Sequence, residues 1–279
     1  TNTIFAGTSN LTIGYRGESS QYFPGYIDDL RISKGIARYT KSFAPPSQAV
    51  GAALTGVNET NTTTDFTSLY LPFDADLNDD SNDSVTVTVN GDAAVSSTQS
   101  KFGGSSLYLD GTGDFLTVPN EVLLPSSASY DFTVEMWVYP TTLVNGRLWS
   151  QWGGGSNRNL LIQTQSDGDV QVYIRSSGGT ESQVTSSGGL TVNTWAHVAV
   201  VRSIDKVILF IDGVQKGSID ISGDLGSYGS AIGIGGRGDS AAAFFEGYID
   251  DLRVLKGYAK YKTDFVPPTS AVGTSVSET

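Results

Sequence analysis

Short apolar segments that alternate with polar residues recur along most of the chain. In "DFTVEMWVYP" (131–140), Phe132, Val134, Met136 and Val138 occupy every second position, which is the period of a strand with one buried face. "SLYLPFD" (68–74), "SLYLDGTGDFLTVP" (106–119), "VQVYIRS" (170–176) and "WAHVAVVRSIDKVILFIDGVQKGSI" (195–219) are similarly short and contain Asp, Gly or Pro at their ends or turns. The "DG" of "FIDGVQKG" predicts a two-residue hairpin turn. The pattern predicts an all-β protein.

The chain repeats itself. "GYIDDLR" occurs at 25–31 and again at 247–253, and the likeness extends over 11–51 and 232–273, with one extra residue before the second motif. Both copies therefore end the same kind of domain. Between them, "GAALTGVNETNTTTDFT" (51–67) is rich in Thr, Asn and Gly, as linkers are. We predict the C-terminal part of an upstream domain at 1–50, a linker at 51–67, a complete domain at 68–273 and a tail at 274–279.

The first copy has few residues ahead of it. A few strands cannot hide both faces, and their open edges favour pairing. We expect residues 1–50 to need upstream sequence, another chain or the flank of the second domain as a partner. The start "TNTIFAG" has neither an initiator Met nor a basic region before an apolar run, so we interpret it as a position inside a longer polypeptide or as a processed end.

Composition and net charge exclude some kinds of site and make some partners unfavourable. The 279 residues include 33 Gly and no Cys, which excludes disulfides and cysteine metal sites. The net charge of −12 makes a nucleic-acid or membrane-surface partner unfavourable. The sequence also has no apolar run of the length, about 18 residues, that a membrane span needs.

The motifs "FTVEMWVYP", "TWAHVAVVRSIDKVILFIDGVQKG" and "IGIGG…GYIDDLRVLKGYAKY" resemble laminin-G-like, concanavalin A-like domains, in versions found in bacteriophage virion and bacterial surface proteins. The resemblance implies a two-sheet antiparallel jelly-roll sandwich, one complete copy preceded by the C-terminal strands of another. It also implies glycan binding on one face or its rim loops, a structural calcium, and a place in a virion or at the cell surface. The fold itself hosts lectins, hydrolases and structural modules.

Catalytic signals are weak. The single His, His197, lies inside a predicted strand, and no nucleophile–base pair surrounds it, so we interpret it as structural. Hydrolytic relatives carry paired carboxylates on one strand face, whereas "DFTVEMWVY" offers Glu135 alone. We expect no enzyme activity, with a polysaccharide hydrolase as a minor alternative.

Acidic residues suggest a metal. The loop 73–84 concentrates Asp74, Asp76, Asp79, Asp80 and Asp83, and oxygen-rich clusters suit calcium. By resemblance, the calcium ligands would be Asp250 with Asp74 or its neighbours, and Asp28 in the first copy. The alternative is that these side chains cap strands and bond backbone amides.

The segment "RLWSQWGGGSNRN" (147–159) suggests a sugar site. Trp149 and Trp152 have opposite strand parity, so at most one of them points into the sandwich, while Trp137 and Trp195 follow apolar patterns typical of the core. Aromatic faces stack on sugars, and amides and guanidinium groups bond the hydroxyls. Our candidate glycan contacts are Trp152, Asn157, Arg158, Tyr173, Arg175 and Tyr228. The alternative is that they complete the core and rim.

"RGDS" at 237–240 corresponds to "RGES" at 16–19. We interpret this stretch as a tight turn rather than an adhesion motif.

Together, these features favour a non-catalytic carbohydrate-binding or adhesion module of a surface-exposed structural protein, such as a phage tail fibre or capsid decoration. Its partners would be a cell-surface glycan and other copies or neighbouring virion proteins. The alternative is a purely architectural repeat that assembles by strand completion between chains.

Overall fold

The computed structural model describes residues 13, 15–16, 21–27, 30, 66–122, 131–152, 158–176, 179–221, 225, 230–240 and 242–274. The chain divides into two compact units, 1–64 and 65–279. Most of the predicted linker lies outside the described residues. No helix within them has the length and apolar character needed to cross a membrane.

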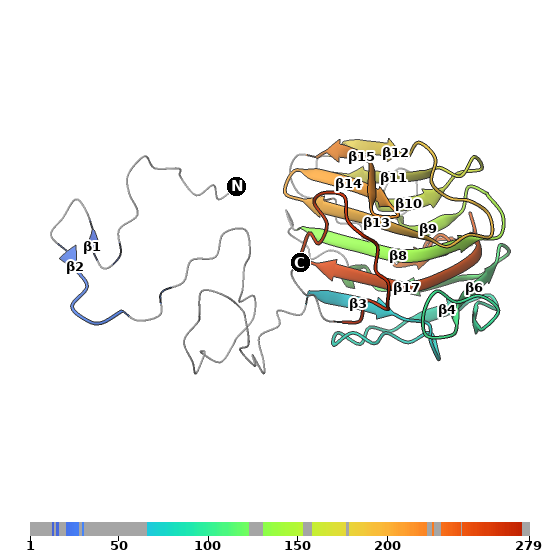
Figure 1. Ribbon diagram of the computed structural model, residues 1–279, viewed down its shortest axis with the longest axis horizontal. Helices are drawn as coiled ribbons and strands as arrows, with labels where there is room; N and C mark the ends of the chain where they lie inside the picture. Colours follow the sequence, from blue (N-terminus) through green and yellow to red (C-terminus); the bar gives the residue numbers. More distant parts are fainter. Residues whose placement is uncertain are drawn as a thin grey trace. The chain divides into compact units, whose positions relative to one another are not determined.

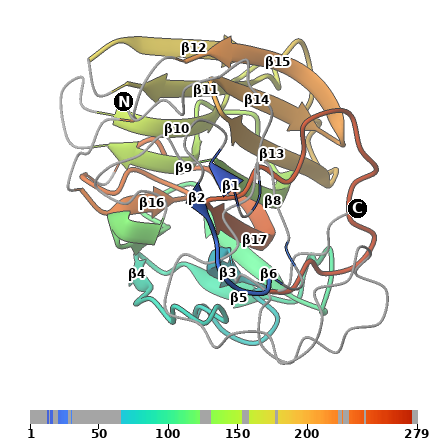
Figure 2. The same cartoon turned by 90° about the vertical axis from the view of Figure 1, so that its left-hand side faces the viewer.

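The second unit is built from two antiparallel sheets, whose layers Figure 2 shows face to face. The sheet that we call the β10 sheet has the order β12(Glu181–Thr185), β11(Val170–Arg175), β10(Arg158–Thr164), β9(Arg147–Trp152), β16(Ile232–Ile234), β7(Phe115–Val118) and β4(Thr88–Asn90). The other, the β17 sheet, has the order β15(Val214–Asp220), β14(Lys206–Ile211), β13(Ala196–Ser203), β8(Phe132–Pro140), β17(Glu246–Lys256), β6(Ser106–Asp110) and β5(Ala94–Ser96), with β3(Thr67–Leu71) also paired to β17. A single short 3₁₀ turn, Asn120–Val122, interrupts this all-β pattern in the described residues. The predicted jelly-roll sandwich is confirmed.

The main core lies between the sheets. Strand alternation sends Val134 and Met136 of β8, and Val172 and Ile174 of β11, into it, and none of them is more than 1% exposed. The predicted DG hairpin is also present: Asp212 and Gly213 join β14 to β15 with φ values of 50° and 75°, as the mirror-image turns of hairpins require.

Strand β17 contains the second "GYIDDLR" and lies in the middle of its sheet, paired with β8 on one side and with β6 and β3 on the other (Figure 1). Its register with β8 shifts between Asp250 and Arg253, and Asp251 has a φ of 50°. This bulge puts Asp250 and Asp251 on the same side of the strand, while Ile249 and Leu252 both enter the core. An extra residue in a bulge has this effect on side-chain direction.

The outward face of the β17 sheet is covered by the C-terminal segment 257–274, which crosses the sheet in Figure 1. Ala259, Tyr261 and Phe265 pack there against residues of β13 and β14 such as Val201 and Phe210. The rings of Tyr261 and Phe265 stack at 3.6 Å. The central strands of the β17 sheet, β14, β13, β8 and β17, are therefore buried on both faces, which explains their long apolar runs, whereas most residues of the edge strands β15 and β5 are exposed or half-buried.

In the first unit, the described residues include the short pair β1(Tyr15–Arg16) and β2(Gln21–Tyr22). Tyr26, Ile27 and Leu30 are 102%, 50% and 55% exposed. Their counterparts in the second copy, Tyr248, Ile249 and Leu252, are 7%, 0% and 0% exposed. The same motif is therefore apolar surface in one copy and buried strand in the other.

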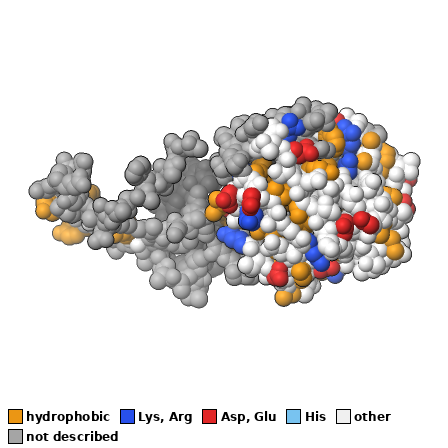
Figure 3. Space-filling model, turned by 90° about the horizontal axis from the view of Figure 1, so that it is seen from above, with side chains coloured by type: hydrophobic (Ala, Val, Ile, Leu, Met, Phe, Trp, Pro, Cys, Tyr) orange, Lys and Arg blue, Asp and Glu red, His pale blue; other side chains and the backbone are white. Residues whose placement is uncertain are grey.

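On the face of the second unit that Figure 3 presents, acidic and basic side chains occur in small groups separated by polar and apolar surface. The negative charge of the chain does not form a continuous patch there.

Candidate functional site

The outward face of the β10 sheet carries the candidate sugar-binding residues. On β11, Val170, Val172 and Ile174 belong to the core, so Gln171, Tyr173 and Arg175 point the other way. Tyr173 pairs with Leu161 of β10, which in turn pairs with Ser150 of β9. Three neighbouring strands thus share one face, on which Tyr173 is half-buried while Leu161 and Ser150 are 1% and 0% exposed.

A register shift on β9 sets which of its side chains reach this face. Arg147 pairs with Gln163 and Trp149 with Ile162, so Leu148 is the extra residue. Leu148 and Trp149 both enter the core, which leaves Arg147 and Trp152 on the outward side. The parity prediction for Trp149 and Trp152 is confirmed.

Planar amides form a hydrogen-bonded row across the face. Arg147 Nη1 donates to Gln163 Oε1. Gln163 Nε2 donates to Gln171 Oε1 at 2.6 Å, and Gln165 Nε2 donates to the same oxygen at 2.9 Å. Gln171 Nε2 continues the row to Thr185 Oγ1 at 3.0 Å. This row fixes amide groups of the type that bond sugar hydroxyls.

Two guanidinium groups lie close to the ring of Trp152. The Arg237 guanidinium carbon is 4.3 Å from its ring centroid and that of Arg147 is 5.8 Å away, within cation–π range. Arg237 itself donates to both carboxylate oxygens of Asp239, at 2.9 and 2.7 Å. The charged ends of "RGD" therefore bond each other, as suits a turn rather than an extended recognition motif.

The structure brings together only part of the predicted set. Trp152, Tyr173 and Arg175 share the outward face, and Arg158 pairs with Trp152 in register. Asn157 and Tyr228 lie outside the described residues, and the Arg158 side chain is likewise not described. The sequence analysis missed Arg147, Gln163, Gln171 and Arg237. Their signal was the strand alternation of "RNLLIQT" and "VQVYIR", which places Gln163 and Gln171 on one face once the strands are aligned.

The two aromatic residues predicted to lie in the core, Trp137 and Trp195, differ in how far they are buried. Trp137 is buried, 5% exposed, but it lies on the outward face of the β17 sheet beneath Lys101 and Phe102. Trp195 is half-buried against Tyr139, at a ring distance of 5.4 Å. The prediction that Trp195 is a core residue is wrong, because it precedes β13 at the margin of the sandwich.

The predicted calcium ligands Asp74 and Asp250 both approach the segment 101–105. Asp250 is fully buried, and its Oδ2 accepts backbone N–H groups of Lys101 and Phe102 at 2.7 and 3.1 Å. Its Oδ1 is buried without a hydrogen-bond partner among the described residues. Burial, with a smaller contribution from the charge of Asp251, raises the pKa of Asp250 to about 7, against the opposing effect of the backbone N–H groups of Phe102, Lys101 and Asp251. An unbonded buried oxygen of this kind fits a cation ligand. The third predicted ligand, Asp28, lies outside the described residues.

Within the acidic loop 73–84, Asp79 bonds backbone amides, as the structural alternative predicted. Asp79 Oδ1 accepts the backbone N–H groups of Tyr70 and Ser81, each at 2.9 Å, and Oδ2 accepts that of Val85 at 2.9 Å. This carboxylate fastens the loop to β3.

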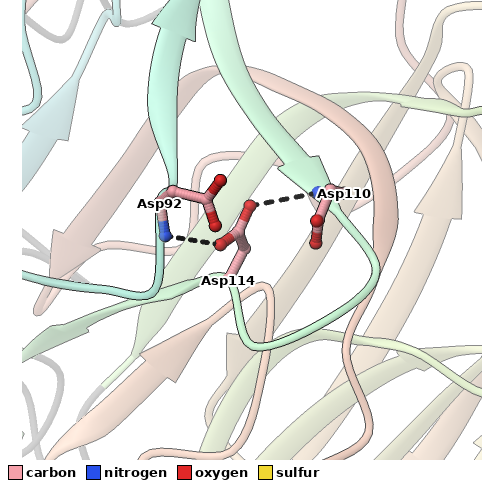
Figure 4. Close-up of side chains that lie close together, drawn as sticks. All are labelled: Asp92, Asp110 and Asp114. Atoms are coloured by element: carbon pink, nitrogen blue, oxygen red, sulfur yellow. Dashed lines mark hydrogen bonds between the residues drawn. The ribbon is translucent and has the colours of Figure 1, made fainter.

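A separate cluster of three acidic side chains lies at the turns next to β5 and β6. Asp92, Asp110 and Asp114 each bring a carboxylate oxygen to within 4.8 Å of the others (Figure 4). Asp114 is 1% exposed and accepts N–H groups of Asp92 at 2.8 Å and Asp110 at 3.2 Å. Both of its oxygens therefore fasten the turns before β5 and after β6. The sequence analysis overlooked this group, whose signal was the turns "NGD" and "DGTGD".

Glu135 and His197 are held in a buried network. Arg253 Nε donates to Glu135 Oε1 at 2.9 Å, and the Tyr261 hydroxyl donates to Oε2 at 2.7 Å. His197 Nε2 is 3.4 Å from the same Oε2. Burial alone would raise the pKa of Glu135, but the charge of Arg253, the hydrogen bond from His197 and the charge of Lys260 together outweigh it and hold that pKa well below its usual range. These contacts support the structural interpretation of His197.

Comparison with known proteins identifies the family. A model described as "concanavalin A-like lectin/glucanases superfamily", of the laminin-G type, matches residues 110–259. The chain belongs to this superfamily, as the motifs suggested. Among curated proteins, none matches the chain.

Solved structures show the same fold at low identity. Domain 4 of AbnA, a GH43 extracellular arabinanase from Geobacillus stearothermophilus, solved in complex with arabinotriose, is 22% identical with a TM-score of 0.54, over 69% of this chain and 93% of that domain. The receptor-binding domain of botulinum neurotoxin D is 19% identical with a TM-score of 0.55, over 70% of this chain and 50% of that one. The chain thus spans about half the length of the neurotoxin domain.

Proposed function

We propose that the second unit is a non-catalytic carbohydrate-binding module of a surface-exposed structural protein, with the outward face of the β10 sheet as its glycan site. The observation that carries the proposal is the arrangement of Trp152 beside the Gln163–Gln171 amide row on one sheet face. Aromatic rings and fixed amides are the groups that bind sugars. The arabinanase domain, whose structure holds arabinotriose, supports the same class of ligand.

A glycan array probed with the full chain, with and without calcium, tests this function. Hits should be weakened by Trp152→Ala, because the ring is lost from the site. They should be unchanged by Trp195→Ala, which removes an aromatic side chain packed on Tyr139. An array without hits in either buffer would sink the proposal.

The proposal excludes hydrolysis. Glu135 is fully buried and bonded to Arg253 and Tyr261, so it is withdrawn from acid–base chemistry. We expect no release of reducing sugar from polysaccharides that the chain binds. Release that persists in Glu135→Gln would instead point to a hydrolytic site elsewhere.

We propose a structural calcium ion at Asp250, with Asp74 contributing from the loop 73–84, and Asp28 in the corresponding position of the first copy. The support is the unbonded buried Oδ1 of Asp250. Calcium there would tie the segment 101–105 to β17.

For the setting, we propose a phage virion component, such as a tail fibre or capsid decoration. The support is the resemblance of "GYIDDLR-x-x-KG-x-A-x-Y" to virion proteins. The parent open reading frame tests it: flanking phage structural genes are expected, and a host metabolic operon would contradict it.

The architectural alternative, assembly by strand completion, rests on a separate observation. Tyr26, Ile27 and Leu30 are exposed although their counterparts in β17 are buried. Exposed apolar strand positions favour pairing with further strands.

Association measurements decide this alternative. If completion occurs between chains, the full chain should form oligomers, and the Ile27→Asp, Leu30→Asp double variant should be monomeric. Ile204→Asp, at an exposed turn of the second unit, is the matched control and should leave association unchanged. A full chain that stays monomeric at all concentrations rules out completion between chains.

A further inference from the structure

Basic residues are unevenly distributed between the sheets. The described strands of the β10 sheet contain Arg147, Arg158 and Arg175, no lysine, and a single acidic residue, Glu181. Arg237 lies in the loop that follows β16 of the same sheet. In a chain with a net charge of −12, the strands of this sheet carry more arginine than acidic residues, although Asp239 in the loop after β16 is paired with Arg237 and Asp167 and Asp169 lie in the β10–β11 turn.

The remaining arginines of the second unit are internal. Arg202 and Arg253, on the β17 sheet, are 1% and 0% exposed, and Arg253 is paired with Glu135. Arg147 and Arg175 are half-buried, and the Arg237 side chain is 23% exposed. The guanidinium groups that reach solvent therefore lie on or beside the β10 sheet.

These groups converge on Trp152. Arg237 and Arg147 lie 4.3 and 5.8 Å from its ring. A guanidinium has five N–H donors in a planar fork, and Asp239 accepts from two of the nitrogens of Arg237. Asp239 thus occupies the Nε edge of this fork and orients the guanidinium, so a ligand carboxylate, the group that a guanidinium matches best, would meet the remaining N–H groups on Nη1 and Nη2.

We infer that this face selects glycans that carry a carboxylate, such as uronic or sialic acids, over neutral ones. The inference rests on the proposed glycan-binding function and specifies its ligand class. The sugar ring occupies the surface at Trp152, the carboxylate pairs with the guanidinium groups of Arg237 and Arg147, and the amide row from Gln163 to Gln171 bonds hydroxyls. The long-range negative charge of the protein lowers the rate of encounter, but the local pairs determine selectivity.

Matched ligands that differ only in whether their carboxylates are charged test the inference. Titration calorimetry of the full chain would compare oligogalacturonate with its methyl ester, and sialyllactose with its methyl ester. We expect the charged member of at least one pair to bind about tenfold or more tightly, and its affinity to fall with added salt. Which pair responds distinguishes uronic from sialic acid.

Variants connect the preference to the site. Arg237→Gln should abolish most of the preference for the charged ligand, and Arg237→Lys should restore it only in part, because a point charge replaces the fork. Lys262→Gln removes the same charge from an exposed position in the segment 257–274 and should change nothing. Thermal unfolding of each variant reports any loss of folding separately.

The outcomes separate the two proposals. Equal affinity for charged and neutral members would overturn the inference and leave the proposed function in place. A preference that survives Arg237→Gln and Arg147→Gln together would move it to another surface and also overturn the inference. Binding of no glycan, neutral or acidic, would refute both.

Discussion

Arg253 and Glu135 form an ion pair, Nε to Oε1 at 2.9 Å, in which both side chains are fully buried on the outward face of the β17 sheet. The pair links the central strand β17 to β8, and Tyr261 and Lys260 of the covering segment approach the same carboxylate. One carboxylate thus joins two strands and the segment that covers them.

Removing one member of this ion pair should strongly destabilise the folded protein. Arg253→Met leaves the buried carboxylate of Glu135 without its closest cationic partner, so we expect a loss of about 3–5 kcal/mol in the free energy of unfolding. The double variant Arg253→Met, Glu135→Leu should recover much of this loss, because neither charge of the pair is then left buried alone. Urea denaturation measures both. A double variant as unstable as the single one would contradict the explanation.

The stability of the second unit should depend on pH through Asp250. Its pKa is raised from 3.8 to about 7, chiefly by burial, so the folded state holds the proton more tightly than the unfolded state. The stabilisation is complete below the unfolded pKa and is lost as the pH rises through about 7, with a slope of up to about 1.4 kcal/mol per pH unit. Asp250→Asn should gain stability relative to wild type as the pH rises. Unfolding at several pH values in calcium-free buffer measures this difference, with the exposed Asp83→Asn as the control.

Calcium should offset the cost of ionising the buried carboxylate of Asp250. A cation at the unbonded Oδ1 of Asp250 favours the ionised carboxylate, so calcium should raise the Tm of the wild type at pH 7 or above. Asp250→Asn should lose most of this shift, and Asp74→Asn part of it. Asp114→Asn distinguishes the neighbouring acidic group: a shift lost there and kept in Asp250→Asn would place the ion among Asp92, Asp110 and Asp114.

The hairpin turn should be sensitive to a single methyl group. A Cβ at Gly213 would lie 1.9 Å from the carbonyl oxygen of Phe265, and Phe265 N–H donates to the Gly213 carbonyl at 2.8 Å. Gly188 has a similar φ of 69° but nothing within 4 Å of its Cβ position. Gly188→Ala should cost about 1 kcal/mol for the left-handed backbone. Gly213→Ala should cost a further 1–3 kcal/mol or so, because it displaces the covering segment. Equal losses on urea unfolding would show that the contact is unimportant.

Local signals made the strands predictable. Alternation identified β8 and the opposite directions of Trp149 and Trp152, and the DG pair identified the β14–β15 turn. The half-burial of Trp195 and the position of Trp137 were not accessible in this way. What buries Trp137 is a segment some 35 residues earlier, at Lys101 and Phe102, and sequence periodicity carries no information about such distant contacts.

The candidate site, too, was only partly predictable from the sequence. Trp152, Tyr173 and Arg175 could be selected by residue type, and strand parity placed them on one face. Arg237 reaches Trp152 from a loop more than 80 residues later, because β16 is inserted next to β9 in the sheet. Only the strand order reveals that neighbourhood.

The central place of β17 has a consequence for how the protein is made. Its partner β8 is synthesised more than 100 residues earlier, and β6 and β3 earlier still. The central strand of the sheet is therefore absent until residue 256 has left the ribosome. Pairings this distant in sequence close slowly. During that interval the early strands of the nascent chain have unpaired edges that can pair with one another or with other nascent chains. A premature stop between β16 and β17 would leave the edges of β8 and of β6 and β3 unpaired, where the finished sheet pairs them with β17.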